Sequence, residues 1–394
     1  MFLSSNRIPN HDTVAVISIE TGSIVLTVVR VTPDSKSHII YVRTLDLESR
    51  TEDTQGDILR RASTKIDEIF REITANKRSY LISRAKTLVL LSAPWNLSWR
   101  EKVAIKRDTP FRITRDFIRE SVENTFNSKH SDLSIISTHL MDIDMNGYKL
   151  ENPIGKLTPS VEFDVFVESA PNEALSVIGA AISMHLPHGD VRFSTKAFAS
   201  VEALVEKSQI KDFVLVLPEY EMTEIIIVRG GVIESCSSIP IGALSIGRGI
   251  FGGSIGQREI VGKMRRFISG MHHNGDSRGA VMRIDISKSE FLKRFYDVLW
   301  QMNASYICPS DVFVCGENPA IHLMVDWISG GDYGGDASSK NNFKVAALSG
   351  KDILLKDGFY GGKDLPFNSA VAVIAAKSLD GAFKKEKNKL KSSI

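Results

Sequence analysis

The sequence predicts an α/β protein built from two similar lobes that face a shared cleft. Residues 14–31 and 213–233 each contain an apolar run, a short polar turn and a second apolar run. Apolar runs bounded by turn residues are typical of β-hairpins. Each hairpin leads into further strand and helix patterns, so we expect the chain to build the same αβ unit twice.

The length and composition of the chain fit this two-lobed prediction. A single hydrophobic core stops growing near about 250–300 residues, and the chain has 394. Its 43% hydrophobic and 24% charged residues are ordinary for a globular protein. The 49 basic and 47 acidic residues leave a net charge of +2, which provides no global field to attract nucleic acid.

Cysteine usage and apolar run lengths predict a cytoplasmic location. Cys236, Cys308 and Cys315 have spacings that fit no disulfide framework and are typical of reduced thiols. No run of about 18 apolar residues occurs, and the N-terminus lacks the apolar core of a signal peptide. We therefore expect a cytoplasmic protein, with peripheral contact at the inner face of the cell membrane as a further option.

The remaining elements can be assigned in order along the chain. Residues 39–42 supply a third strand, and block 86–165 has its own pattern of strand, turn, helix and strand, which predicts a small inserted αβ subdomain. The first lobe is then 1–85 with 166–208, the second lobe 209–365, and 366–394 a closing helix with a basic tail. The helix after the third strand has apolar side chains at helical spacing, namely Leu59, Ala62, Ile66, Ile69, Phe70 and Ile73.

The two hairpin turns lie where such two-lobed folds grip a polyphosphate, yet their residues are poorly suited to that task. Phosphate is cradled by consecutive backbone N–H groups of small residues, chiefly glycine. The turns read SIETG and PEYEM. Pro218 removes one N–H donor, and Glu20, Glu219 and Glu221 place carboxylates where phosphate oxygens would lie. The chain keeps the frame of a phosphate site without its binding groups.

A series of segments resembles a known family in order and spacing. Residues 146–155 (NGYKLENPIG) and the alternating strand at 161–167 resemble the NP-[IV]-G segment and following strand of the actin-like bacterial cell-division protein FtsA, whose relative PilM serves the type IV pilus. The resemblance implies a two-lobed fold of the actin, Hsp70 and sugar-kinase type, with the small subdomain in the first lobe. Further matching segments are 88–92, 111–114, 239–242 (the I-P-x-G turn), 312–316 (the strand and glycine beneath the adenine) and 366–376 (the last helix).

The departures from this family fall on its nucleotide site. Family members that bind ATP have Asp in the first loop where this chain has Ser18, and Gly where it has Glu20, while Leu217 replaces the Asp of the second loop. We therefore expect a pseudo-ATPase with no catalytic residues, no metal and no cofactor. The alternative is a weak ATP and magnesium site that would use Thr21, Gly22, Thr223, Glu224, Gly242 and Gly316.

The resemblance implies a non-catalytic scaffold or adaptor that links a membrane-associated division or pilus assembly complex to cytoplasmic partners. The partners would be proteins of that complex or a second copy of the chain, and not nucleic acid. The segment at 146–155 favours the FtsA side of the family. The alternative function is that of a weak ATP-binding actin-like ATPase that assembles in a nucleotide-dependent way.

Two tryptophans, Trp95 and Trp99, flank a turn in the predicted subdomain. Tryptophan is enriched at binding hot spots, so the pair could anchor a protein partner. One or both could instead fold back to cover the subdomain core. The resemblance favours partner binding, because the family uses this subdomain for contacts with neighbouring molecules.

The tail from residue 379 to 394 is a candidate membrane contact. Its apolar residues fall on one helical face with lysines around them, and each lysine near an anionic surface adds about 1 kcal/mol of attraction. FtsA-like proteins attach to membranes through such a helix. Glu386 interrupts the apolar face here, so a solvated basic tail is the favoured reading. The residues that would touch membrane are Phe383, Lys384, Lys385, Leu390 and Ile394.

Overall fold

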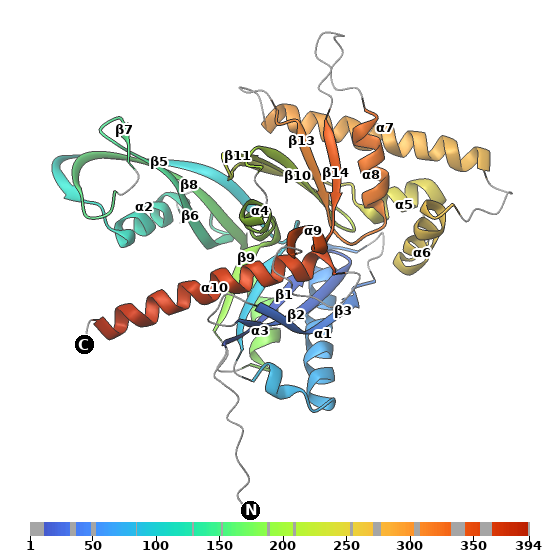
Figure 1. The fold of residues 1–394 in the computed structure, drawn as a ribbon, viewed down its shortest axis with the longest axis horizontal. Coiled ribbons are helices and arrows are strands. Elements are labelled where there is room, and N and C mark those ends of the chain that lie inside the picture. The colour runs from blue at the N-terminus through green and yellow to red at the C-terminus, as the bar shows by residue number, and fades with distance from the viewer. Residues whose placement is uncertain are drawn as a thin grey trace, which may run out of the picture.

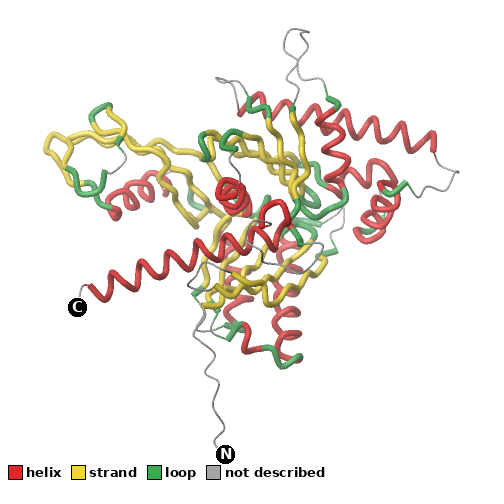
Figure 2. The backbone as a smooth tube through the Cα atoms, in the orientation of Figure 1, coloured by secondary structure: helices red, strands yellow, loops and turns green. Residues whose placement is uncertain are grey.

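The computed structural model describes residues 12–31, 37–48, 53–83, 85–127, 130–150, 153–186, 190–207, 210–252, 255–270, 277–302, 308–331, 343–354 and 365–392. Two five-stranded sheets and one four-stranded sheet form its framework. The three sheets stand out as the yellow segments of the backbone trace (Figure 2).

The first five-stranded sheet has the order β3-β2-β1-β4-β9. Strands β1, β2 and β3 pair antiparallel, whereas β4 and β9 add in parallel. The hairpin register pairs Ser18 with Val25 across the first turn, so the predicted hairpin is confirmed. The strands are β1 (Asp12–Ile19), β2 (Ser23–Val31), β3 (Ser37–Asp46), β4 (Lys86–Leu91) and β9 (Val191–Thr195).

The second five-stranded sheet repeats this plan with the order β12-β11-β10-β13-β14. Again three strands pair antiparallel and two add in parallel. Pro218 pairs with Thr223 across the second turn, which confirms the second hairpin. The strands are β10 (Phe213–Pro218), β11 (Thr223–Arg229), β12 (Val232–Ile239), β13 (Asp311–Cys315) and β14 (Lys344–Leu348). The chain therefore builds the same sheet twice.

The small third sheet, ordered β5-β8-β6-β7, projects from the first lobe (Figure 1). Helix α2 (Arg115–Asn127) packs on it, and Val103, Phe126 and Phe163 lie in its separate core. The strands are β5 (Leu97–Arg112), β6 (Leu133–Met145), β7 (Tyr148–Lys149) and β8 (Leu157–Pro171).

The predicted boundary of this subdomain at residues 86–165 needs correction at both ends. Strand β4 pairs in parallel with β1, so residues 86–91 belong to the first-lobe sheet. At the other end β8 runs on to Pro171 and still pairs with β6 there. The sequence shows that 88–92 is a strand, but only pairing decides which sheet receives it.

Alternating side chains of the first sheet face two different helical layers. Ala15 and Ile17 pack under α1 (Gln55–Ala75), which follows the predicted helical spacing, and under α3 (Asn172–Ser183). Val14 and Val16 point to the opposite face, as the two-residue period of a strand requires. That opposite face shares one core with the second sheet and with α4 (Lys196–Lys207), α9 (Gly350–Leu354) and α10 (Phe367–Ser392).

The far face of the second sheet is covered by four more helices. They are α5 (Ala243–Phe251), α6 (Gln257–Ile268), α7 (Ser277–Met302) and α8 (Ala320–Ser329). In the first lobe there is also a short 3-10 helix, Ser79–Leu81. Helix α10 begins in the shared core, where residues 370–376 are buried, and its last turns extend away from both lobes (Figure 1).

The predicted membrane contact of the tail involves side chains that the structure does not describe. The backbone of α10 is helical through Ser392. The structure does not describe the side chains of Phe383, Lys384, Lys385 and Leu390, and it does not describe Ile394. Among the described residues, no helix combines the length and apolar character that crossing a membrane would require.

Candidate functional site

The two hairpin turns are closed by equivalent hydrogen bonds. In the first turn the N–H of Glu20 donates to the carbonyl of Ser23 at 3.0 Å, and in the second the N–H of Glu219 donates to the carbonyl of Met222 at 2.8 Å. Glu20 and Glu219 therefore occupy matching positions in the two lobes. Their side chains are buried, with only 5% and 1% of each residue exposed.

Lys196 joins these two carboxylates. It is the first residue of α4 and is 2% exposed. Its Nζ lies 2.5 Å from Oε1 of Glu20 and 2.7 Å from Oε1 of Glu219. Because the two acids belong to opposite lobes, one ammonium group bridges the lobes. We call Glu20, Lys196 and Glu219 the junction triad.

Polar side chains from three other elements complete the coordination of the triad. Asn368, near the start of α10, donates from Nδ2 to Oε1 of Glu20 at 2.7 Å. Ser23 donates to Oε2 of Glu20 at 2.9 Å, and Ser92, just after β4, donates to Oε1 of Glu219 at 3.3 Å. The charges of the triad are thus satisfied by the protein itself.

The two acids of the triad differ in their affinity for protons. Burial would raise the pKa of Glu20, but Lys196 and the hydrogen bonds from Lys196, Glu219 and Asn368 outweigh it and lower that pKa. Burial and the negative charge of Glu20 raise the pKa of Glu219 well above its usual value, against the pull of Lys196. Burial also works against the charge of Lys196, yet the two carboxylates prevail and raise its pKa. Of the two acids, Glu219 therefore binds a proton more readily than Glu20.

The predicted nucleotide-binding residues of the first turn are engaged by the second lobe. The Oγ1 of Thr21 accepts a hydrogen bond from the N–H of Glu221 at 3.1 Å. The ring of Tyr220 covers Gly22 so closely that a Cβ built on this glycine would lie 2.1 Å from the Cγ of Tyr220. The carbonyl of Gly22 accepts from Nε2 of Gln257 at 2.7 Å. The small residue serves contact between the lobes.

The predicted residues of the second lobe are likewise engaged by protein groups. Thr223 donates from Oγ1 to the carbonyl of Ile241 at 2.7 Å, and Glu224 accepts from Nδ2 of Asn96 at 3.1 Å. A Cβ on Gly242 would lie 2.5 Å from the backbone of Tyr220.

Gly316 and Glu317 mark the end where the family holds the adenine. Gly316 has φ of +155°, and a Cβ there would lie 3.3 Å from Ile321 and 3.4 Å from the carbonyl of Pro218. Glu317 accepts from the N–H of Asn368 at 2.9 Å, and burial raises its pKa. Protein atoms thus surround the glycine, and a third acid lies close to the triad.

These residues do not fit ATP and magnesium. The matching turn positions that cradle phosphate elsewhere carry Glu20 and Glu219, and the positive charge of Lys196 is already neutralised by them. The Tyr220 ring and backbone cover the backbone of Gly22 and Gly242, where phosphate would approach. Among the described residues, no group of three or more His, Cys, Asp or Glu side chains is arranged to hold a metal ion.

Sequence reasoning identified the acids of this site but missed Lys196 and Asn368. Lys196 opens α4 in the segment FSTKAFASVEALV, where it is the only basic residue among mostly apolar and small neighbours. A lone lysine in such surroundings is a signal of a buried charge, since burying one requires a partner of opposite sign. Asn368 carries no comparable signal.

The tryptophans of the predicted partner site have different environments. Trp95 is 3% exposed and packs in the first-lobe core with the strands under α1 and α3, so the prediction that it anchors a partner is wrong. Trp99 lies within β5, half-buried against Phe126 and His130 at ring separations of 5.7 and 5.2 Å. Both rings fold back onto the protein, and partner binding by the exposed part of Trp99 stays a prediction.

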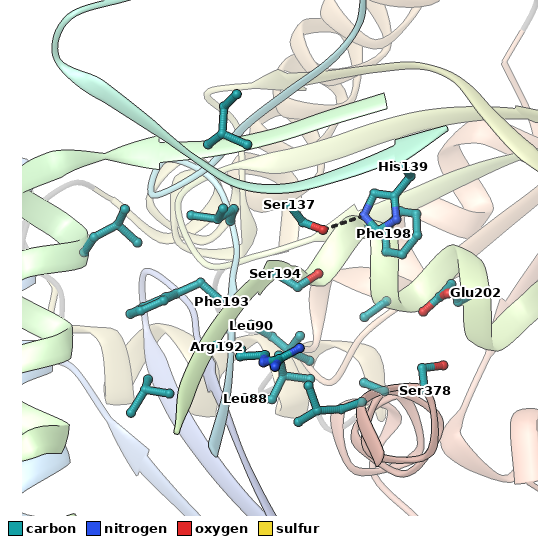
Figure 3. Close-up of a pocket in the computed structure, with 17 residues that line it drawn as sticks. Leu88, Leu90, Ser137, His139, Arg192, Phe193, Ser194, Phe198, Glu202 and Ser378 are labelled. Atoms are coloured by element: carbon teal, nitrogen blue, oxygen red, sulfur yellow. Dashed lines mark hydrogen bonds between the residues drawn. The ribbon is translucent and has the colours of Figure 1, made fainter. Parts of the chain in front are cut away.

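A second candidate site is a groove of about 510 Å³ between the first sheet and the small sheet. We call it the side groove. It is lined by β4, β6, β9, α3, α4 and the middle of α10, and Figure 3 shows Phe193, Phe198 and Glu202 among its walls. The lining is mostly apolar, and its polar residues are Ser137, His139, Arg192, Ser194, Glu202 and Ser378. Such a lining is typical of a binding groove.

Two polar residues of the side groove, His139 and Ser194, contact one buried acid behind it. Glu168, fully buried, lies 2.6 Å from Nε2 of His139 and accepts from Oγ of Ser194 at 2.9 Å. The ring of His139 stacks on Phe198 at 3.6 Å. Burial raises the pKa of nearby Glu202, opposed by His139 and aided by the negative charge of Glu168. The groove therefore offers an acidic group beside an aromatic wall.

The fold of the chain is similar to that of a chain in the PilM-PilN type IV pilus biogenesis complex. The TM-score is 0.64 at 11% identity, over 93% of this chain and 98% of that chain. Weaker similarities are to the ethanolamine utilization protein EutJ from Carboxydothermus hydrogenoformans (TM-score 0.43, 12% identity, 91% and 89% covered) and to a Bacteroides thetaiotaomicron protein with an actin-like ATPase fold and unknown function (0.42, 8%, 89% and 97%). No protein-family model and no curated protein sequence matches the chain. The predicted actin-like fold is confirmed.

Proposed function

We propose that this chain is a non-catalytic actin-like scaffold that links a membrane-associated assembly complex, of the pilus or division type, to cytoplasmic partners. The observation that carries the proposal is the junction triad. Lys196 binds one acid from each hairpin turn, at 2.5 and 2.7 Å. In an actin-like fold these turns would otherwise face a nucleotide.

Electrostatics support the absence of nucleotide turnover in this proposal. A phosphate group placed between the turns would meet two buried carboxyl groups, in surroundings where like charges repel far more strongly than in water. Displacing both acids would separate them from Lys196 and leave buried charges without partners, which is strongly unfavourable. The chain thus uses the centre of the fold for its own contacts.

The scaffold role requires a surface for a protein partner, and we assign it to the side groove. PilM occurs in one complex with PilN, and a partner segment here would lie along β9. That strand pairs only with β4 among the described residues, so its other edge has no paired strand, although β6 lies near it. Glu202 beside Phe198 favours an apolar segment that carries a basic residue. This is a partner of defined chemistry, an extended basic-apolar peptide.

Titration with Mg-ATP by calorimetry and by melting temperature tests the non-catalytic part of the proposal. The wild-type chain should give no binding heat at millimolar ATP. The double variant Glu20→Gly with Glu219→Gly should gain affinity, because it removes both acids and frees Lys196 for phosphate. Ligand at a hundred times its Kd would add about 2.7 kcal/mol of stability, which is easily measured.

Glu221→Gly is the matched control for this titration. Glu221 lies in the same turn and carries the same charge, but it pairs with Arg248 outside the triad. Its removal should leave ATP affinity unchanged. Binding of ATP by the wild-type chain would overturn the proposal and support nucleotide-dependent assembly instead.

A further inference from the structure

The contacts between the lobes converge on the hairpin turns. Besides the triad, Gln257 of α6 donates to the carbonyl of Gly22, and Asn96 of the first lobe donates to Glu224 of β11 at 3.1 Å. The N–H of Glu221 donates to Thr21 at 3.1 Å. Each of these bonds joins the two lobes, and each lies within or beside the turns. This polar region therefore joins the lobes in addition to the apolar core that they share.

The charge of the triad depends on a single proton. Two ionised carboxylates and one ammonium would leave a net negative charge in a buried site, whereas one proton on either acid makes the triad neutral. Glu219 is the acid that takes up this proton more readily, because burial and the charge of Glu20 raise its pKa. Glu20, Lys196 and Tyr220 interact electrostatically with Glu219, and Glu224 and Glu317 interact with Glu20 and Lys196.

The neighbouring groups reinforce this dependence. Burial raises the pKa values of Glu224 and Glu317, so these acids also resist ionisation beside the triad. Burial and several nearby carboxylates raise the pKa of Tyr220. Lys196 is the only cation with a direct ion pair to the triad acids among the described residues. A second negative charge would therefore find no further cation to compensate it there.

We propose that the junction triad is a clasp that holds the two lobes in one relative orientation, and that it closes only while the two acids share one proton. Lys196 provides the bridge that a bound ligand supplies in a nucleotide-dependent fold. Loss of the proton puts two negative charges within reach of the same ammonium and loosens the contact between the turns. This inference rests on the proposed function, since it requires the site to be free of nucleotide.

The direction of the pH effect follows from the proton on Glu219. An acid with a raised pKa in the folded state contributes its full stabilisation below the pKa of an exposed glutamate, about 4.3. That stabilisation is lost as the pH rises through the raised value. Glu20 has a lowered pKa, so its contribution disappears only in acid. The clasp should therefore open as the pH rises, while strong acid should weaken it by a separate route.

Hydrogen exchange measured by mass spectrometry tests the clasp. Peptides that cover residues 18–23 and 218–223 report on the turns, and peptides from α7 report on global unfolding. In the wild-type chain we expect the protection of the turns, corrected for intrinsic exchange, to fall at least tenfold between pH 6 and pH 9 while α7 stays protected. Glu219→Gln keeps a neutral hydrogen-bonding group and should hold the turns protected at both pH values.

Two further variants keep the test decisive. Lys196→Met should remove the protection of the turns at both pH values. If this variant does not fold, the comparison of wild-type with Glu219→Gln still decides the question. The uncharged combination Glu20→Gln, Lys196→Met and Glu219→Gln should fold and show no pH dependence in the turns.

Turn protection that is independent of pH in the wild-type chain, or equally pH-dependent in Glu219→Gln, would overturn the clasp. Neither result would affect the scaffold proposal, which fails only if the wild-type chain binds Mg-ATP in the calorimeter. The two failures are therefore distinguishable.

Discussion

The buried acids of the junction triad differ in their contacts from Glu202, the half-buried acid of the side groove. In the triad, Glu20 and Glu219 share one ammonium and accept further hydrogen bonds from the protein. In the groove, the carboxylate of Glu202 has no ion pair or direct hydrogen bond within the described part of the chain, although burial raises its pKa. Charged groups that have ion pairs and hydrogen bonds within the protein help to hold the fold together. A charged group without such bonds is available to a partner. In our proposal, the centre of this fold is structural and the side groove is the surface for recognition.

The largest expected effect comes from removing the cation of the triad. Lys196→Met leaves two buried acids without their partner, which typically costs about 3–5 kcal/mol. Urea unfolding followed by circular dichroism would measure the loss. Lys293→Met, on the exposed face of α7, is the matched control and should change stability by less than about 0.5 kcal/mol.

The uncharged triple variant sharpens this result. Replacing a whole buried ionic group by neutral residues is often neutral in stability, because the desolvation cost disappears with the charges. Glu20→Gln, Lys196→Met and Glu219→Gln together should therefore recover most of the stability lost in Lys196→Met. A loss as large as that of the single variant would mean that Lys196 acts through its shape and not through its charge.

A smaller effect is expected where the two lobes touch at Gly22. A methyl group on this residue would lie 2.1 Å from the ring of Tyr220, so Gly22→Ala should cost about 1–3 kcal/mol through overpacking. Adding Tyr220→Ala should relieve that clash, and the double-mutant cycle would give a coupling of opposite sign to the single loss. Thermal unfolding of the four proteins measures it.

Gly179 provides a control of the opposite sign. It lies within α3 and a Cβ there would meet nothing within 4 Å. Gly179→Ala should therefore stabilise the chain by about 0.5–1 kcal/mol, because alanine is the better helix former. A gain at Gly22 as well would show that the lobes do not press together there.

The sequence allowed the repeated sheet to be predicted because hairpins are local. Each turn and its two flanking strands form one continuous segment, residues 12–31 and 213–229, so alternation and turn residues predict them directly. The acids of the turns were visible for the same reason. The sequence could not show that β4 belongs to the first-lobe sheet and not to the subdomain, because β4 joins β1 through parallel pairing between distant segments.

Local sequence patterns could not predict the junction triad. Lys196 is 176 residues from Glu20, and Asn368 is 348 residues from it. No periodicity connects such positions, and only the folded chain brings them together. Trp95 was misread for a related reason, since a residue in a polar-looking turn can point inward when two helices cover that face. Its burial follows from α1 and α3, which the turn sequence does not contain.

The smallest effect on stability, and the most direct test of the side groove, is expected at Glu202. Glu202→Lys should leave the free energy of unfolding within about 1 kcal/mol of wild-type, since no described ion pair is broken. Binding should change strongly. Extended synthetic peptides with an apolar core and one lysine should bind the wild-type chain, as measured by fluorescence anisotropy, and lose at least tenfold in affinity for the variant.

The charge-swapped peptides make this test specific. If Glu202 selects a partner by its charge, the same peptides with glutamate in place of lysine should bind the Glu202→Lys variant more tightly than the wild-type chain. Glu290→Gln, at an exposed position of α7 far from the groove in sequence, should change neither affinity. Equal binding of both peptides by both proteins would remove the groove as the partner site. The triad would then remain a structural feature, and the contrast between a satisfied centre and an available side would no longer explain how the chain recognises its partner.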